Sequence, residues 1–292
     1  KLSIMIKSIR TIRWITRATI ILVGVVLLLG TAYENTVYAK TTKEMIHESI
    51  GELIAIKDDT TLEPKAKEAR ELESAKATLQ KITKVGHEEA VSFKKKLKAL
   101  TIEKLVTDDY TFDAGTITET LHGLLTYYNA YYNEMAKRIQ NTTTQEEVQA
   151  IAGDLESWRN TVYNPGIQII LSIDFILKQK NVIAISNNRF EKILNDLRRL
   201  KNNKLVSSLT DLDPLLRQAT ADQKIAVALG QDGTTLLLQT LQHLESDDRS
   251  TIAATNYKKI KNVVEQSFVK VRDMYKQFME INKKVQVMLQ GQ

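Results

Sequence analysis

Two Glu-x-x-His pairs are the residues whose types and spacing come closest to a reactive centre. Glu44 precedes His47 and Glu119 precedes His122, so each pair places a carboxylate and an imidazole on one face of a helix. In di-iron carboxylate bundles, two such helices combine with two further glutamates to hold the metal ions. Here the resemblance ends at the spacing, because those bundles place a glutamate-bearing helix before the first pair, and only a leader precedes Glu44. We therefore predict no metal site and no cofactor, and these four residues are the only metal candidates.

No sequence pattern of a nucleophilic or nucleotide-binding enzyme occurs in the chain. Cysteine is absent, and so are Gly-x-Ser-x-Gly, His-Glu-x-x-His, the phosphate-binding glycine loop and Gly-x-Gly-x-x-Gly. Asp154 and Glu156 lie close to Trp158 in the sequence. Residues two apart on a helix point to different sides, so this pair cannot flank one glycosidic bond. We predict no catalytic residue and a protein that is not an enzyme.

Four tyrosines form the most aromatic stretch, and we take them as candidates for partner binding. Tyr127, Tyr128, Tyr131 and Tyr132 fall on a helix predicted over 116–140. Adjacent residues cannot share one helix face, so half of the group must point away from the buried stripe. Such a face can bind a partner or a glycan, although packing between paired helices is the commoner role of tyrosines and the favoured interpretation here.

One apolar run, Ala18–Leu29, predicts where the protein resides. Five cations and no acid precede it, and the small residue Ala39 follows a short polar stretch. This is the layout of a secretory signal, cleaved after Ala39. The alternative is an uncleaved anchor, although extending the run to Tyr33 gives only about 16 residues against the ~20 of a spanning helix. Both interpretations place residues 40 onward outside the cytoplasm: secreted, periplasmic or on the outer face of the cytoplasmic membrane.

The charge of the chain does not indicate a nucleic-acid partner. Residues 1–39 hold five cations and one acid, so +4 of the net charge of +6 belongs to them and +2 to the rest. A charge this close to neutral is too small for a phosphate-binding surface. Without cysteine there are no disulfides, so stability must come from helix packing.

Composition and periodicity predict an all-α protein. Only 3 Pro and 11 Gly occur in 292 residues, and 26% of the residues are charged. The expected helices cover 44–57, 63–106, 116–140, 144–162, 167–200, 213–230, 235–245 and 250–289. The sharpest expected breaks are Asn164–Pro165–Gly166 and Gly230.

The predicted fold is an elongated antiparallel bundle of coiled-coil-like long helices, preceded by the signal or anchor segment. The expected organisation is a signal peptide or membrane anchor at 1–39, a helical bundle at 40–200, and a helical hairpin at 201–292 that continues or caps the bundle. The leading hypothesis is a structural or interaction protein, such as an envelope scaffold, adhesin or assembly subunit. It would bind other proteins or itself through helix faces, and the membrane through residues 1–39 if these are retained. The alternatives are an extracytoplasmic ligand-binding or sensory bundle and, third, a metal-binding bundle.

Overall fold

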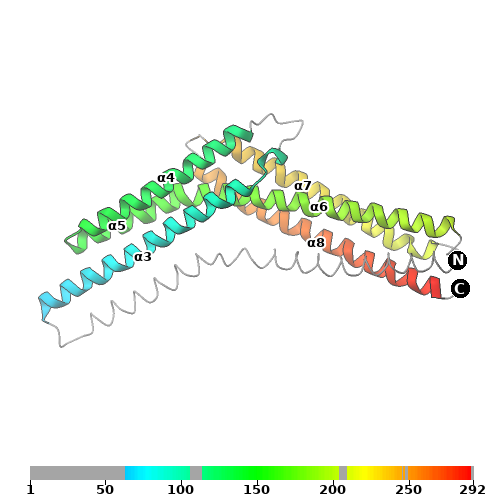
Figure 1. Ribbon diagram of the computed structural model, residues 1–292, viewed down its shortest axis with the longest axis horizontal. Coiled ribbons are helices and arrows are strands. Elements are labelled where there is room, and N and C mark those ends of the chain that lie inside the picture. Colours follow the sequence, from blue (N-terminus) through cyan, green and yellow to red (C-terminus); the bar gives the residue numbers. More distant parts are fainter. Residues whose placement is uncertain (1–62, 106–113, 204–208, 245, 247–248, 291–292) are drawn as a thin grey trace. The chain divides into compact units, whose positions relative to one another are not determined.

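The computed structural model describes residues 63–105, 114–203, 209–244, 246 and 249–290, and every regular element in these ranges is helical (Figure 1). The all-α prediction is confirmed for this part of the chain. In chain order the elements are α3 (Pro64–Ala99), η1 (Ile102–Leu105), α4 (Ala114–Asn141), α5 (Gln145–Trp158), the π-helical turn η2 (Arg159–Tyr163), α6 (Asn164–Asn202), η3 (Thr210–Leu212), α7 (Asp213–Gln242) and α8 (Arg249–Gln290).

The leader and the expected helix at 44–57 lie outside the described residues. Among the helices that the structure describes, none carries an apolar stretch long enough to cross a membrane.

The described helices form two compact units. Unit A comprises the described parts of Tyr33–Ile173 and Thr240–Tyr257, and unit B comprises Asp174–Gln239 and the described part of Lys258–Gln292. Helices α6, α7 and α8 each contribute residues to both units.

In unit A, α3 runs antiparallel to α4. Lys76, in the first half of α3, donates from Nζ to the carbonyls of Gln140 (3.2 Å) and Thr142 (2.8 Å). Lys94, near the end of α3, donates to Oγ1 of Thr126 at 3.1 Å. Later residues of α3 therefore meet earlier residues of α4, which fixes the antiparallel direction that is visible in Figure 1.

A capping box starts α5, as the sequence predicted. The Thr144 side chain accepts from the Glu147 amide at 3.2 Å, and the Glu147 carboxylate accepts from the Thr144 amide at 3.3 Å. These contacts satisfy amides that the first turn of a helix otherwise leaves without partners. Because the chain reverses here within a few residues, α5 returns antiparallel to α4, with Arg138 opposite Asp154 at 2.9 Å.

The expected break at Asn164–Pro165–Gly166 is wrong, because the helix continues through it. The five residues Arg159–Tyr163 form a π turn, closed by a bond from the Asn164 amide to the Arg159 carbonyl. Proline lacks an amide hydrogen, and its ring would strike the carbonyl four residues earlier in a regular α-helix. The wider π turn accommodates that ring without ending the helix.

The π turn also shifts the buried stripe by one residue. Regular spacing from Trp158 predicts Val162 as the next buried residue, yet Val162 is half-buried and Tyr163 is 1% exposed. The extra residue in the π turn therefore turns Tyr163 into the core.

Unit B packs around aromatic and aliphatic side chains of α6, α7 and α8. Phe278 is 2% exposed, stacks on Phe190 at 5.6 Å between ring centroids, and meets the edge of Tyr275 at 5.3 Å. Phe268 of the same helix is only partly buried, because Ser267 (0% exposed) faces the core and donates to the Ala226 carbonyl at 3.2 Å. The core cluster consists of Val182, Ile183, Phe190, Ile193, Leu197, Leu212, Ala219, Ala226, Val271, Met274, Tyr275, Phe278, Ile281 and Val285.

The expectation that Gly230 ends a helix is also wrong, because α7 continues to Gln242. A Cβ at Gly230 would lie 2.9 Å from Cδ1 of Ile183, and one at Gly233 would lie 2.7 Å from Cδ1 of Ile176. Glycine inside a helix costs roughly 0.5–1 kcal/mol relative to alanine. Here it permits the close approach of α6, so it serves packing rather than termination.

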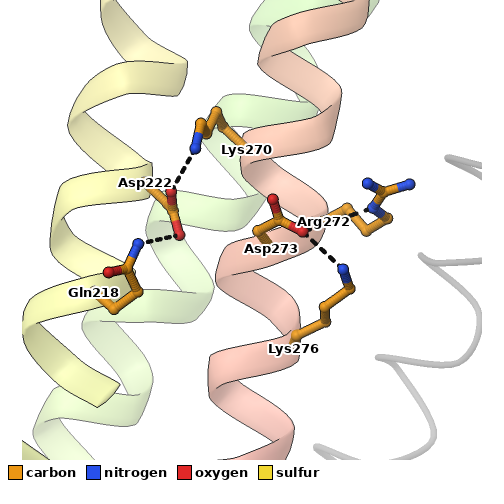
Figure 2. Close-up of polar contacts among 6 residues, drawn as sticks. All are labelled: Gln218, Asp222, Lys270, Arg272, Asp273 and Lys276. Atoms are coloured by element: carbon orange, nitrogen blue, oxygen red, sulfur yellow. Dashed lines mark hydrogen bonds and ion pairs between the residues drawn. The ribbon is translucent and has the colours of Figure 1, made fainter. Parts of the chain in front are cut away.

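A partly buried ion pair links α7 to α8 within unit B (Figure 2). Asp222 is 1% exposed, accepts from Lys270 Nζ at 3.1 Å and accepts from the side-chain amide Nε2 of Gln218 at 3.2 Å. On the outer side of α8, Asp273 pairs with Lys276 at 2.8 Å. The two carboxylates differ in role: Asp222 depends on its partners because water does not reach it, whereas Asp273 is partly solvated.

The helix predicted to run from Pro64 to about residue 106 ends earlier, at Ala99. Leu100 adopts an extended conformation, and the 3₁₀ turn η1 follows. By contrast, the last predicted helix, 250–289, agrees with α8 to within one residue at each end.

Candidate partner-binding surface

The four tyrosines of α4 divide into a buried pair and an outward pair. Tyr128 and Tyr132 are both 0% exposed, whereas Tyr127 is 49% exposed and Tyr131 is half-buried. The prediction that half of the group points away from the core agrees with this arrangement.

Trp158, at the end of α5, lies at the centre of the tyrosine group. Its ring stacks on Tyr131 with centroids 3.9 Å apart and planes at 15°. Tyr128 and Tyr132 meet it edge-on at 5.6 and 5.2 Å, and Tyr127 meets it at 6.3 Å. The edge-on contacts at these distances are a favourable geometry for aromatic pairs. The aromatic contacts therefore run without interruption from the core of unit A to the exposed Tyr127.

Arg159, the first residue of the π turn, fixes the inner end of this cluster. Its Nη1 donates to the Tyr132 hydroxyl at 2.6 Å, and its Nη2 lies 3.5 Å from the Glu89 carboxylate of α3. The guanidinium also sits over the ring of Tyr163, 4.9 Å from the centroid. One cation thus connects α3, α4 and the π turn.

Burial raises the pKa of the Tyr132 hydroxyl, and the positive charge of Arg159 opposes that rise without cancelling it. Burial likewise raises the pKa of Tyr163, and the negative charge of Glu89 adds to the effect. The Tyr163 hydroxyl has no hydrogen-bond partner of acceptable geometry among the described residues. Both phenols therefore stay neutral at any physiological pH and serve as packing groups rather than bases.

Two glycines make room for the buried tyrosines. A Cβ at Gly86 of α3 would overlap the ring of Tyr132, and a Cβ at Gly166 of α6 would overlap the hydroxyl of Tyr128. Tyr128 also donates to the Val162 carbonyl at 3.1 Å, in the π turn. The buried pair is therefore held on all sides, which gives the outward pair a rigid base.

The outward pair, Tyr127 and Tyr131, together with the flanking Glu134, Arg138 and Asp154, forms what we call the aromatic face. The Arg138–Asp154 ion pair borders it, with side chains 41% and 52% exposed. Tyr127 contacts Tyr131 with ring centroids 6.4 Å apart.

The metal candidates are not brought together by the described part of the structure. Glu119 is exposed and His122 is half-buried on α4, while Glu44 and His47 lie outside the described residues. Within the ranges that the structure describes, no three His, Asp or Glu side chains gather as a metal site would require.

Three contributors to the cluster were not identified as functional residues from the sequence: Arg159, Glu89 and Tyr163. The capping box at Thr144 was the one indication in the sequence that Trp158 lies near the tyrosines. A helix that starts there and runs antiparallel to α4 brings its end opposite the tyrosines.

Comparison of the chain with protein-family models, with curated proteins and with solved structures finds no match.

Proposed function

We propose that this protein is a non-enzymatic helical interaction protein that binds another protein through the aromatic face of α4 and α5. The single observation that carries the proposal is Tyr127: a large aromatic side chain, 49% exposed, held at the edge of a buried aromatic cluster. Tyrosine and tryptophan are enriched at the energetic centres of protein interfaces. A single exposed tyrosine would not support the proposal, but the ring of Tyr127 contacts the rings of Tyr131 and Trp158.

Rigidity favours the same interpretation. Tyr131 is stacked on Trp158, and its hydroxyl lies 3.5 Å from the Asp154 carbonyl. Ordering a side chain at an interface costs roughly 0.5–1.5 kcal/mol, so a face that is already ordered before binding loses less on association. The aromatic face is ordered by the cluster beneath it.

The site of action that we propose is the outer side of a membrane. The apolar run Ala18–Leu29 and the cations that precede it support this location. Whether residues 1–39 are removed or kept as an anchor, the part that carries the aromatic face is exported in both cases. Long helices with regular buried stripes suit a scaffold or assembly subunit.

Site-specific photocrosslinking in the source cells tests the function. A benzoylphenylalanine at position 127 should give a crosslinked protein that the same group at 287, an exposed position of α8 (69%), does not give. The identified protein is then purified, and its binding to the unmodified chain and to Tyr127→Ala and Val287→Ala is measured. We expect at least ten-fold weaker binding for Tyr127→Ala and none of that loss for Val287→Ala. Equal crosslinking at both positions, or equal binding by both variants, would refute the proposal.

A further inference from the structure

We infer that the partner segment recognised by the aromatic face is basic and contains arginine. This inference rests on the proposed function and adds the chemistry of the partner. It follows from the charges around the tyrosines and from their spacing along α4.

The two helices that carry the aromatic face are acidic in a basic protein. Together α4 and α5 hold six carboxylates and two cations, although the whole chain has a net charge of +6. All six carboxylates are exposed: Glu119, Glu134, Glu146, Glu147, Asp154 and Glu156. One of the two cations, Arg138, is already neutralised by Asp154 at 2.9 Å. The excess of carboxylates on these two helices favours a cationic partner over an anionic one.

Helical spacing places a carboxylate in line with the tyrosines. Tyr131 lies one turn after Tyr127 on α4, and Glu134 follows at the next turn, seven residues from Tyr127. Glu134 forms no ion pair among the described residues, and its neighbour Arg138 is bound to Asp154. Two aromatic rings followed by an unpaired carboxylate make a receptor for one guanidinium.

Arginine fits this receptor better than lysine does. Its planar guanidinium stacks on an aromatic face and donates two parallel hydrogen bonds to a carboxylate, whereas the lysine ammonium is a strongly hydrated point charge. The protein already contains one such arrangement in its interior, where Arg159 sits over Tyr163 and reaches Glu89. The aromatic face presents the ring and the carboxylate of that arrangement without a guanidinium over the ring.

Titration of the 292-residue chain with a labelled 12-residue peptide carrying four arginines tests this inference. Two matched peptides replace those arginines with lysine or with citrulline, which keeps the shape of arginine and removes its charge. The variants are Tyr127→Ala and Glu134→Gln, with Val287→Ala and Glu191→Gln as controls that change an exposed apolar side chain and an exposed carboxylate outside the face. Fluorescence anisotropy at low and high salt gives the affinities.

The expected result is binding of the arginine peptide, weaker binding of the lysine peptide and no binding of the citrulline peptide. Tyr127→Ala and Glu134→Gln should each weaken the arginine complex about five-fold, as expected for loss of one exposed cation–π or ionic contact. The two controls should bind as the unchanged chain does, and salt should weaken every complex.

Three results would overturn the inference: no binding of the arginine peptide, equal binding by Tyr127→Ala, or concentration-dependent self-association that Tyr127→Ala abolishes. The last result would mean that a second copy of the chain covers the face. If the crosslinked partner identified at position 127 contacts the face through a segment without basic residues, the inference fails while the proposed function stands.

Discussion

Replacing Gly86 by alanine tests whether the buried tyrosine pair is held as tightly as its surroundings imply. The new methyl group would overlap the Cε1 and Cζ atoms of Tyr132 and would lie 2.6 Å from its hydroxyl oxygen. That ring is 0% exposed, its hydroxyl accepts from Arg159 at 2.6 Å, and Trp158 and Tyr163 close on it from the sides. The ring therefore has no open direction in which to move.

Two effects of opposite sign decide the result. Alanine in place of glycine stabilises a helix interior by about 0.5–1 kcal/mol. Extra volume in a packed core costs typically about 1–3 kcal/mol, and the enclosed ring places this site at the upper end. We expect a net loss of about 2 kcal/mol in the free energy of unfolding of unit A, or roughly 4–8 °C in Tm.

Gly123→Ala is the matched control, because a Cβ at Gly123 on the adjacent α4 meets nothing within 4 Å. That variant should show only the stabilisation that alanine gives to a helix interior. The two substitutions should therefore change the free energy of unfolding in opposite directions. Urea denaturation followed by Trp158 fluorescence reports on this unit, with the Trp14 signal removed by Trp14→Phe. If Gly86→Ala stabilises the protein as Gly123→Ala does, the close contact between Gly86 and Tyr132 does not exist in solution.

Three further changes test unit B and the start of α5. Phe278→Ala should lower the free energy of unfolding by about 3–5 kcal/mol, and Phe268→Ala should lower it clearly less. The drop in Tm of each variant should be the same at two protein concentrations. A Tm that moves only with concentration would instead show that α8 pairs with another chain. Lys270→Met should lower the free energy of unfolding by about 3–5 kcal/mol, measured by urea denaturation, because it leaves the Asp222 carboxylate, which is 1% exposed, without its cation. Asp222→Asn should lower it less, because Lys270 can then turn to water. The reverse order would contradict this account. The amides of Thr143 and Thr144 hold the pKa of Glu147 below its ordinary value of 4.5, so its stabilisation is present above that pH and is lost as the pH falls through the lower folded value. Glu147→Gln should flatten the acid dependence of Tm, and an unchanged acid limb would show that the capping box contributes nothing to it.

The helices could be predicted from the sequence wherever local signals and packing agreed. The start of α5 at Thr144 and the extent of α8 rest on a capping box and on a long regular stripe, and the structure confirms both. Gly230 and Pro165 were misread, because each was judged by its local propensity to end a helix. At both positions the deciding factor is tertiary: the approach of Ile183 to Gly230, and the π turn ahead of Pro165.

The candidate surface was predictable only in part. Helical geometry required that two of the four tyrosines point outward, and Tyr127 does so. The choice of Tyr132 over Tyr131 for the core depends on which neighbour leaves space, and that space is the missing side chain of Gly86. Arg159 and Glu89 lie 70 residues apart, so their contact follows from the packing of α3 against the π turn and not from any local pattern.

The π turn at Arg159–Tyr163 is also a place where related chains could differ in length by one residue. Removing one residue, such as the exposed Thr161, would bring Tyr163 to the fourth position after Trp158, where a regular α-helix buries its next side chain. The residues on either side would keep their faces, so a homologue one residue shorter could carry the same two helices as one unbroken rod. Such a homologue would need another residue in place of Pro165, whose ring the wider turn accommodates. A one-residue gap in this segment and a change at Pro165 are therefore expected to occur together in any alignment of related chains.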